Sequence, residues 1–202
     1  MNDVDRLPPS RFDFQTDRLH LRLLDEGDES LYCSLYADHE TMRFIGEPLS
    51  RERALRSMPK AIAAAARSPP RGVFMVVHER ATQRPIGICG ISRFDTGMTR
   101  AEVGIMLESK SRSKGYGSEL LEALVEQAFR MFPINEIRVQ CSAMNPVVER
   151  MVNGLGFTLC SDPAIFLGPL RQRNWSIHRP GCRCSHETHR QEVPHVQRHP
   201  FS

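Results

Sequence analysis

Three apolar runs follow one another between residues 72 and 107, separated only by short turns. The runs cover 72–79, 86–94 and 101–107, and the turns between them read RATQRP and DTGMTR. Apolar runs of this length, bounded by turn residues, are typical of strands, and connections this short join antiparallel neighbours. The middle of the chain is therefore predicted to form three antiparallel strands, and the remaining elements are expected to extend or cover this sheet.

The segments on either side alternate between the periods of a strand and of a helix. Further strands are predicted at 14–24, 136–143, 157–161 and 173–179. Helices are predicted at 25–42, from Ser50 to the SPPRG sequence at 68–72, from the loop at 112–117 to Pro133, and at 145–157. The order βααβββαβαββ predicts a mixed sheet with helices on its faces, in the α/β to α+β range.

Length and composition indicate a single domain with a polar segment at each end. The 202 residues are 40% hydrophobic and 25% charged, which suits one domain with a buried core. Residues 1–13 are polar and proline-bearing, and we expect a flexible leader there. Residues 180–202 lack periodicity and large apolar groups, and we expect a disordered polar tail. The domain itself is predicted to cover residues 14–179.

Neither the N-terminus nor the net charge points to a membrane or a nucleic acid. The first residues lack the basic and then apolar pattern of a secretory signal, and no apolar run reaches the length of a membrane span. The formal net charge of +3 is too small to indicate nucleic-acid binding by itself. We therefore expect a cytoplasmic protein without a membrane or nucleic-acid partner.

The cysteines suggest neither disulfides nor a zinc site. Four of the six stand singly among apolar residues and are predicted to be free thiols: Cys33, Cys89, Cys141 and Cys160. The other two, Cys182 and Cys184, lie in the tail near several histidines. Their spacing is C-x-C, whereas structural zinc sites usually contain C-x₂₋₄-C pairs. No metal site is predicted.

A basic segment with two glycines stands between the strand at 101–107 and a leucine-rich helix. It reads Arg112-Ser113-Lys114-Gly115-Tyr116-Gly117. The first N–H groups of a helix lack partners within it and lie at the positive end of its dipole, so such an entrance favours an anion, often a phosphate. The alternative interpretation is a glycine-bearing surface turn.

In this context the segment closely resembles the acyl-coenzyme A signature [QR]-x-x-G-x-[GA] of the GNAT superfamily of N-acetyltransferases. Other segments are similar to the branch that acts on ribosomal-protein N-termini, the RimJ/RimL type: FQTDRLHLRLL, AEVGIML, and Asn145 with Leu155-Gly156-Phe157. The resemblance covers roughly residues 14–179. It implies the GNAT fold, with a mixed, mostly antiparallel central sheet flanked by helices.

The resemblance also implies acetyl-CoA as co-substrate, with no metal. Backbone N–H groups of the loop would hold the pyrophosphate, with no Cβ in the way at the two glycines, and the strand at 101–107 would pair with the pantetheine arm and polarise the thioester carbonyl. The residues so implied are Ile105, Met106, Leu107, Arg112, Ser113, Lys114, Gly115, Tyr116, Gly117, Ser118 and Asn145. Asn145 is equally suited to be a helix N-cap, and the basic side chains of Arg112 and Lys114 to be solvated.

Attack on a thioester requires a neutral amine, so a base that accepts its proton is useful at neutral pH. Strand alternation places Glu102 on one face with Gly104 and Met106, beside the expected thioester. Glu102 is therefore the candidate catalytic base, acting through a water molecule. The alternative is a strand glutamate that faces solvent or pairs with an arginine.

One departure from the family pattern concerns the departing thiolate. The serine of the family's N-x-x-S segment is Val148 here, so the general acid is unassigned. Tyr116, expected to stack or to face solvent, is a poor candidate. The predicted activity is acetyl transfer to a protein N-terminus or a small-molecule amine by direct attack in a ternary complex, in a monomer or homodimer. The alternative is a non-catalytic acyl-CoA sensor or interaction module.

Overall fold

The structure, a computed structural model, describes residues 9–161, 165–167 and 170–181. Its strands are β1 (Phe14–Gln15), β2 (Leu19–Leu23), β3 (Gly72–Glu79), β4 (Arg84–Ser92), β5 (Arg100–Leu107), β6 (Glu136–Ser142), β7 (Thr158–Leu159), β8 (Ile165–Leu167) and β9 (Leu170–His178). Its α-helices are α1 (Glu29–Ala37), α2 (His39–Met42), α3 (Arg51–Ala64), α4 (Tyr116–Met131) and α5 (Pro146–Gly154).

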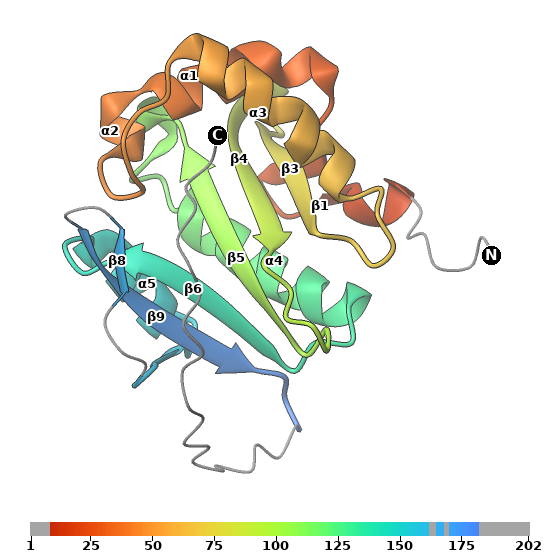
Figure 1. Cartoon of the computed structure of the whole chain (residues 1–202), viewed down its shortest axis with the longest axis vertical. Coiled ribbons are helices and arrows are strands. Elements are labelled where there is room, and N and C mark those ends of the chain that lie inside the picture. Colours follow the sequence, from red (N-terminus) through yellow and green to blue (C-terminus); the bar gives the residue numbers. More distant parts are fainter. Residues whose placement is uncertain (1–8, 162–164, 168–169, 182–202) are drawn as a thin grey trace, which may run out of the picture.

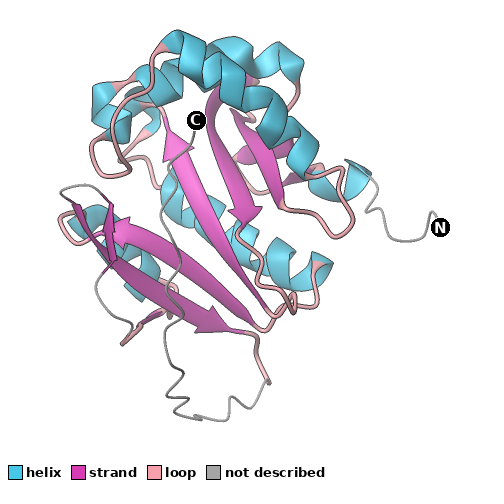
Figure 2. Ribbon diagram, viewed as in Figure 1, coloured by secondary structure: helices cyan, strands magenta, loops and turns pink. Residues whose placement is uncertain are grey.

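The described strands form one sheet in the order β1-β2-β3-β4-β5-β6-β9-β7, and β8 pairs with β9. The pair β5–β6 is parallel, and the other pairs are antiparallel. Helices lie on both faces of the sheet (Figure 1, Figure 2). The predicted mixed, mostly antiparallel sheet flanked by helices is confirmed, including the three consecutive strands β3, β4 and β5.

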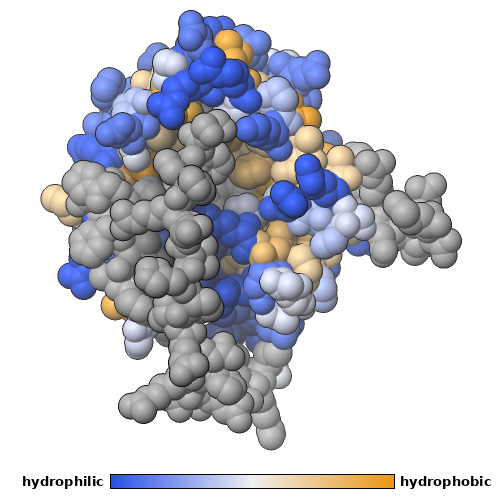
Figure 3. Space-filling model, in the orientation of Figure 1, coloured by the Kyte–Doolittle hydropathy of each residue, from blue (hydrophilic) through white to orange (hydrophobic). Residues whose placement is uncertain are grey.

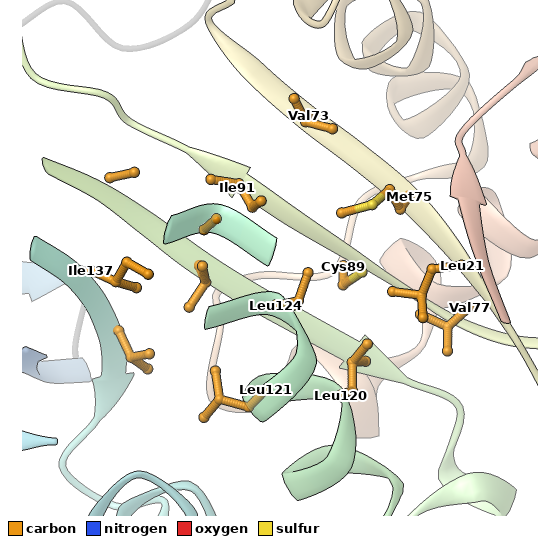
Figure 4. Close-up of a cluster of buried hydrophobic side chains, with 14 of the residues drawn as sticks. Leu21, Val73, Met75, Val77, Cys89, Ile91, Leu120, Leu121, Leu124 and Ile137 are labelled. Atoms are coloured by element: carbon orange, nitrogen blue, oxygen red, sulfur yellow. The ribbon is translucent and has the colours of Figure 1, made fainter. Parts of the chain in front are cut away.

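The two faces of the sheet bury two apolar clusters. On one face, Leu120, Leu121 and Leu124 of α4 pack against residues of β3 and β4 such as Met75 and Ile91 (Figure 4). These leucines lie on one side of α4 because an α-helix repeats every 3.6 residues. Along β3 and β4, the residues that alternate with Met75 and Ile91 point to the opposite face of the sheet, toward α1 and α3. Each of these strands therefore contributes side chains to both clusters.

On the opposite face, Val76 of β3 and Ile88 of β4 pack with residues of α1 and α3. α3 begins at Ser50, whose side chain accepts the N–H of Arg53, and it contributes Ala54 and Met58 to this cluster. The exposed surface of the helices at the top of the view is mostly hydrophilic (Figure 3). α3 is therefore an amphipathic cover of the sheet.

Side chains divide two elements that the sequence predicted as continuous. The helix expected over 25–42 is a 3₁₀ turn (Glu26–Asp28) followed by α1 and α2, and Asp38 ends α1 by capping α2 through the N–H of Thr41 at 2.8 Å. The strand expected over 14–24 turns after β1, where Thr16 Oγ1 accepts the N–H of Leu19 at 3.0 Å. β8 was not predicted, because three residues are too few to show a period.

The fold includes residues that precede residue 14. Residues Pro9–Phe12 form a 3₁₀ helix, and Phe12 is 3% exposed within the core that contains β2 and α4. This part of the segment expected to be a flexible leader therefore belongs to the fold. The burial of Phe12 could not be predicted from composition, because its neighbours are polar and a single aromatic residue shows no periodicity.

We expect Phe12→Ala to lower the free energy of unfolding by about 3–5 kcal/mol, since it removes a buried aromatic side chain and leaves a cavity. Urea denaturation followed by circular dichroism measures this value. The exposed neighbour supplies a matched control, Arg11→Ala, for which the change should stay within about 0.5 kcal/mol. Equal effects of the two substitutions would show that Phe12 is not part of the core.

Three of the four singly placed cysteines are buried and the fourth, Cys160, is half-buried, and all four are free thiols, as predicted. Within the described residues no helix is long and apolar enough to cross a membrane, and no group of side chains is suited to hold a metal ion. The tail residues Cys182 and Cys184 and their neighbouring histidines lie outside the described residues.

Candidate active site

β5 and β6 separate after a short stretch of pairing. Their register joins only Arg100, Ala101 and Glu102 to Glu136, Ile137 and Arg138. β5 stays paired with β4 as far as Leu107, so the two parallel strands diverge from one end of the sheet (Figure 1). The result is an opening in the sheet that is bordered on one side by the backbone of β5.

The backbone groups of β5 that border this opening follow from its pairing with β4. The N–H of Glu108 donates to the carbonyl of Ile86 at 2.9 Å, and in an antiparallel pair the residues that bond to one neighbour alternate. The backbone groups of Ile105 and Leu107 therefore point toward the opening, whereas those of Met106 point to β4. Of the three residues expected to pair with the pantetheine arm, Met106 is thus not placed to do so.

The side chains of β5 alternate between the two faces as predicted. Ala101, Val103 and Leu107 are buried in the core with α4, whereas Glu102 and Met106 lie on the other face. Between them Gly104 is exposed, and a Cβ added there would meet nothing within 4 Å. This face of β5 is therefore open at Gly104, one alternate position from the candidate base.

Glu102 is half-buried and forms an ion pair. Its Oε2 lies 3.1 Å from Nη1 of Arg93, and the same nitrogen donates to Oε1 of Gln140 at 3.3 Å. Oε1 of Glu102 makes no hydrogen bond with a described residue. The arginine partner that the sequence left as the alternative to a catalytic role is therefore present, although one carboxylate oxygen remains available to a water molecule or an amine.

The loop before α4 ends in an array of unpaired N–H groups. Ser113 and Gly115 have positive φ values of 60° and 81°, and Gly115 is the N-cap residue of α4 without a capping side chain. The N–H groups of Tyr116, Gly117 and Ser118 find no acceptor among the described residues. They lie at the positive end of a helix of 16 residues, so this entrance is suited to an anion.

Arg112 faces away from these N–H groups. Its Nε donates to the carbonyl of Leu107 at 3.1 Å and its Nη2 to Oγ1 of Thr41 at 2.7 Å. The guanidinium thus connects the loop to α2. Lys114 is exposed, so of the two basic residues expected near the phosphates only Lys114 has a side chain that is not held elsewhere.

Of the two expectations for Tyr116, stacking or exposure, the ring is stacked, with the guanidinium carbon of Arg18 4.8 Å from its centroid, and the side chain does not face solvent. It is 8% exposed, and its hydroxyl donates to Oε1 of Glu79 at 2.5 Å. This hydrogen bond raises the pKa of Tyr116. The pKa of Glu79 is lowered, first by its hydrogen bond from Thr82 and then by that from Tyr116. Tyr116 therefore anchors the start of α4 to β3.

The two glycines of the loop lie close to side chains of other elements. A Cβ at Gly115 would lie 3.2 Å from Nη2 of Arg18, and a Cβ at Gly117 would lie 3.3 Å from Sδ of Met151 in α5. The sequence argument reserves this space for the pyrophosphate, which stays a prediction. The structure adds that the missing side chains also leave room for the side chains of Arg18, from the turn before β2, and of Met151 from α5.

Asn145 caps α5, as the structural alternative predicted. Its Oδ1 accepts the N–H of Val148 at 3.3 Å, and Pro146 follows at the first helical position. Val148 is half-buried against the core, so it supplies no proton donor at the position of the family serine. The cap uses only the side-chain oxygen of Asn145, and its side-chain amide nitrogen has no hydrogen-bond partner among the described residues.

The model of the family described as acetyltransferase (GNAT) domain matches residues 18–158, which include the opening, the loop and α5. The chain belongs to the GNAT acetyltransferase family. Its relatives include the uncharacterized N-acetyltransferase p20 of Bacillus licheniformis, 26% identical over 143 residues that cover 70% of this chain and 80% of the relative. A similar protein is the uncharacterized N-acetyltransferase YoaA of Bacillus subtilis strain 168, 25% identical over 71% of this chain and 81% of that protein.

Solved GNAT structures share this fold. The spermidine N-acetyltransferase of Vibrio cholerae, solved with CoA and spermine, superposes with a TM-score of 0.70 at 19% identity, over 81% of this chain and 96% of that one. RimL, a ribosomal L7/L12 alpha-N-protein acetyltransferase solved with CoA, gives a TM-score of 0.69 at 16% identity, over 81% and 95%. At these identities the likeness establishes the fold.

Sequence reasoning missed Arg93, which pairs with Glu102, Gln140, which accepts from Arg93, and Arg18, which contacts the loop. Arg93 and Gln140 stand in no motif and Arg18 lies outside the acyl-coenzyme A signature, and each contact joins residues that are far apart along the chain or separated by a turn. The one available signal was the charge of the two arginines, which is uninformative in a chain with 27 lysine and arginine residues.

We expect Arg112→Ala to lower the free energy of unfolding by about 1 kcal/mol, because it removes charged hydrogen bonds to Leu107 and Thr41 from a partly exposed site. Chemical denaturation measures the effect. Lys114→Ala is the matched control and should change stability by less than about 0.5 kcal/mol. Equal losses in the two variants would contradict the connecting role of Arg112.

Proposed function

We propose that this protein transfers the acetyl group of acetyl-CoA to a primary amine by direct attack in a ternary complex. The observation that carries the proposal is the opening between β5 and β6, which leads along an unpaired strand edge to the N–H groups at the start of α4. A strand edge suits the amides of the pantetheine arm, and a helix entrance suits the pyrophosphate. Membership of the GNAT family supports both assignments.

In this proposal the backbone does most of the cofactor binding. The N–H groups of Tyr116, Gly117 and Ser118 hold the pyrophosphate, and Ile105 and Leu107 pair with the arm. A backbone N–H at this edge also stabilises the oxyanion that forms when the amine attacks the thioester carbonyl. Asn145 and Lys114 supply further polar contacts at the two ends.

The cysteines support direct attack rather than an acyl-enzyme. Cys33, Cys89 and Cys141 are buried, and burial raises the pKa of each thiol. A nucleophilic cysteine needs an accessible, low-pKa thiolate, which is the opposite environment. These three thiols are therefore poor nucleophiles, and in the proposed mechanism the amine of the acceptor attacks directly.

Glu102 is the proposed base, acting through a water molecule on the open side of β5 near Gly104. Arg93 holds one carboxylate oxygen and fixes its orientation, while the other oxygen receives the proton. The bond from nitrogen to the carbonyl carbon forms as the proton passes to Glu102, and the carbon–sulfur bond then breaks. Because Val148 offers no hydroxyl, the thiolate takes its proton from water or another group.

The proposed acceptor is a protein N-terminus or a small-molecule amine. We also propose that the protein belongs to the RimJ/RimL-like branch of the family. The similar structures come from proteins that act on both kinds of amine, spermidine in one case and a ribosomal protein in the other. A second candidate function is an acyl-CoA sensor. Val148 and the Glu102–Arg93 ion pair favour it, because they reduce the number of groups available for proton transfer.

Release of the CoA thiol separates these two functions. With acetyl-CoA fixed, the protein should release thiol in the presence of a peptide with a free N-terminus or of spermidine and other small amines. The same peptide with a blocked N-terminus is the matched control and should give none. Saturable binding of CoA without thiol release for any acceptor would favour the sensor, and absence of CoA binding would contradict both functions.

We expect Glu102→Gln to lower kcat by roughly 10²–10⁴-fold at pH 7, the range for loss of general-base catalysis. The loss should shrink as the pH rises, because the amine then deprotonates in solution. The affinity for acetyl-CoA should change little, since the cofactor is held by backbone groups. Steady-state kinetics across pH measure both effects.

Arg93→Gln is the matched control, because it removes the same ion pair but leaves the carboxylate. It should keep most of the activity if Glu102 is the base. Equal losses in Glu102→Gln and Arg93→Gln at every pH would mean that the ion pair matters only for structure. Near wild-type kcat in Glu102→Gln at pH 7 would leave proton removal to water.

A further inference from the structure

Arg18, in the turn between β1 and β2, reaches the loop that precedes α4 from the side opposite to Arg112. We propose that Arg18 is a positioning residue for the cofactor loop: it fixes the peptide between Lys114 and Gly115, and with it the direction of the Gly115 N–H, and it neutralises a carboxylate at the start of α4. The inference rests on the proposed use of acetyl-CoA. It concerns a residue that lies outside the signature segment and is 96 positions away from the loop residue that it contacts.

The first contact fixes a peptide plane. Nη1 of Arg18 donates to the carbonyl of Lys114 at 2.8 Å. In a planar trans peptide the carbonyl and the following N–H point in opposite directions. With the Lys114 carbonyl directed at Arg18, the N–H of Gly115 points away from Arg18, and the peptide cannot rotate to present its carbonyl to an anion.

In the second contact, the guanidinium of Arg18 lies over the first residues of α4. The guanidinium carbon lies 4.8 Å from the centroid of the Tyr116 ring, and Nη2 lies 3.2 Å from where a Cβ at Gly115 would be. The φ of 81° disfavours a side chain at Gly115, and one there would also press on the guanidinium of Arg18. Arg18 thus packs closely over the first glycine of the loop.

The third contact concerns charge. Nε of Arg18 lies 2.6 Å from Oε2 of Glu119, in the first turn of α4. Burial opposes ionisation of Glu119, but hydrogen bonds from Thr16 and Arg18 lower its pKa, so the carboxylate is ionised at neutral pH. An unpaired carboxylate here would repel a pyrophosphate at the same helix end. Arg18 removes that repulsion.

The experiment compares CoA binding, by calorimetric titration, in Arg18→Ala and in a matched variant of the same turn. Arg80→Ala is the control, because Nη1 of Arg80 donates to the carbonyls of Thr16 at 2.8 Å and Asp17 at 2.9 Å without touching the loop. We expect Arg18→Ala to weaken CoA binding about tenfold or more and Arg80→Ala to change it less than about twofold. In turnover, Arg18→Ala should raise the KM for acetyl-CoA while kcat at saturation stays near the wild-type value.

Charge repulsion is tested separately with the double variant Arg18→Ala/Glu119→Gln, which should recover part of the lost CoA affinity. If Arg18→Ala does not fold, Arg18→Lys is measured instead, and it should fold and bind CoA more weakly than the wild type. CoA affinity that is unchanged in Arg18→Ala or Arg18→Lys, or equally reduced in Arg80→Ala, would overturn the proposal. Failure of the wild-type protein to bind CoA would overturn the proposed function instead.

Discussion

The parallel pairing of β5 with β6 over three residues on each strand determines the rest of the site. Because the pairing stops at Glu102, the strands diverge, and the backbone of β5 beyond that point has a neighbour on one side only. An unpaired strand edge inside a domain is unfavourable unless another group satisfies it. The opening, the start of α4 and the candidate base are all arranged along this one edge.

Two ion pairs neutralise carboxylates near the opening. Arg93 pairs with Glu102 on the open face of β5, and Arg18 pairs with Glu119 at the start of α4. In both cases an arginine from a turn or strand end holds a carboxylate beside the proposed path of the cofactor. The N–H groups at the start of α4 and the exposed ammonium of Lys114 therefore remain without a hydrogen-bond partner among the described residues.

The sequence predicted what depends on neighbouring residues and missed what depends on long-range contacts. The strand at 101–107, its two faces, the loop and the cap at Asn145 follow from alternation, glycine content and capping chemistry. The partners of Arg112 and Arg93 lie 71 and 47 positions away, and no local pattern encodes those distances. The burial of Phe12 and of Tyr116 was missed for the same reason, since each is held by packing against residues that are remote in the chain.

The bond from Arg112 to Thr41 gives α2 a mechanical connection to the proposed cofactor loop. α2 lies on the face of the sheet that carries Glu102, whereas the loop leads into the helix on the other face. An acceptor that displaces α2 has to disturb Arg112, and with it the carbonyl of Leu107 at the strand edge. For such an acceptor, the two substrates are thermodynamically linked: the factor by which one changes the affinity of the other holds in both directions.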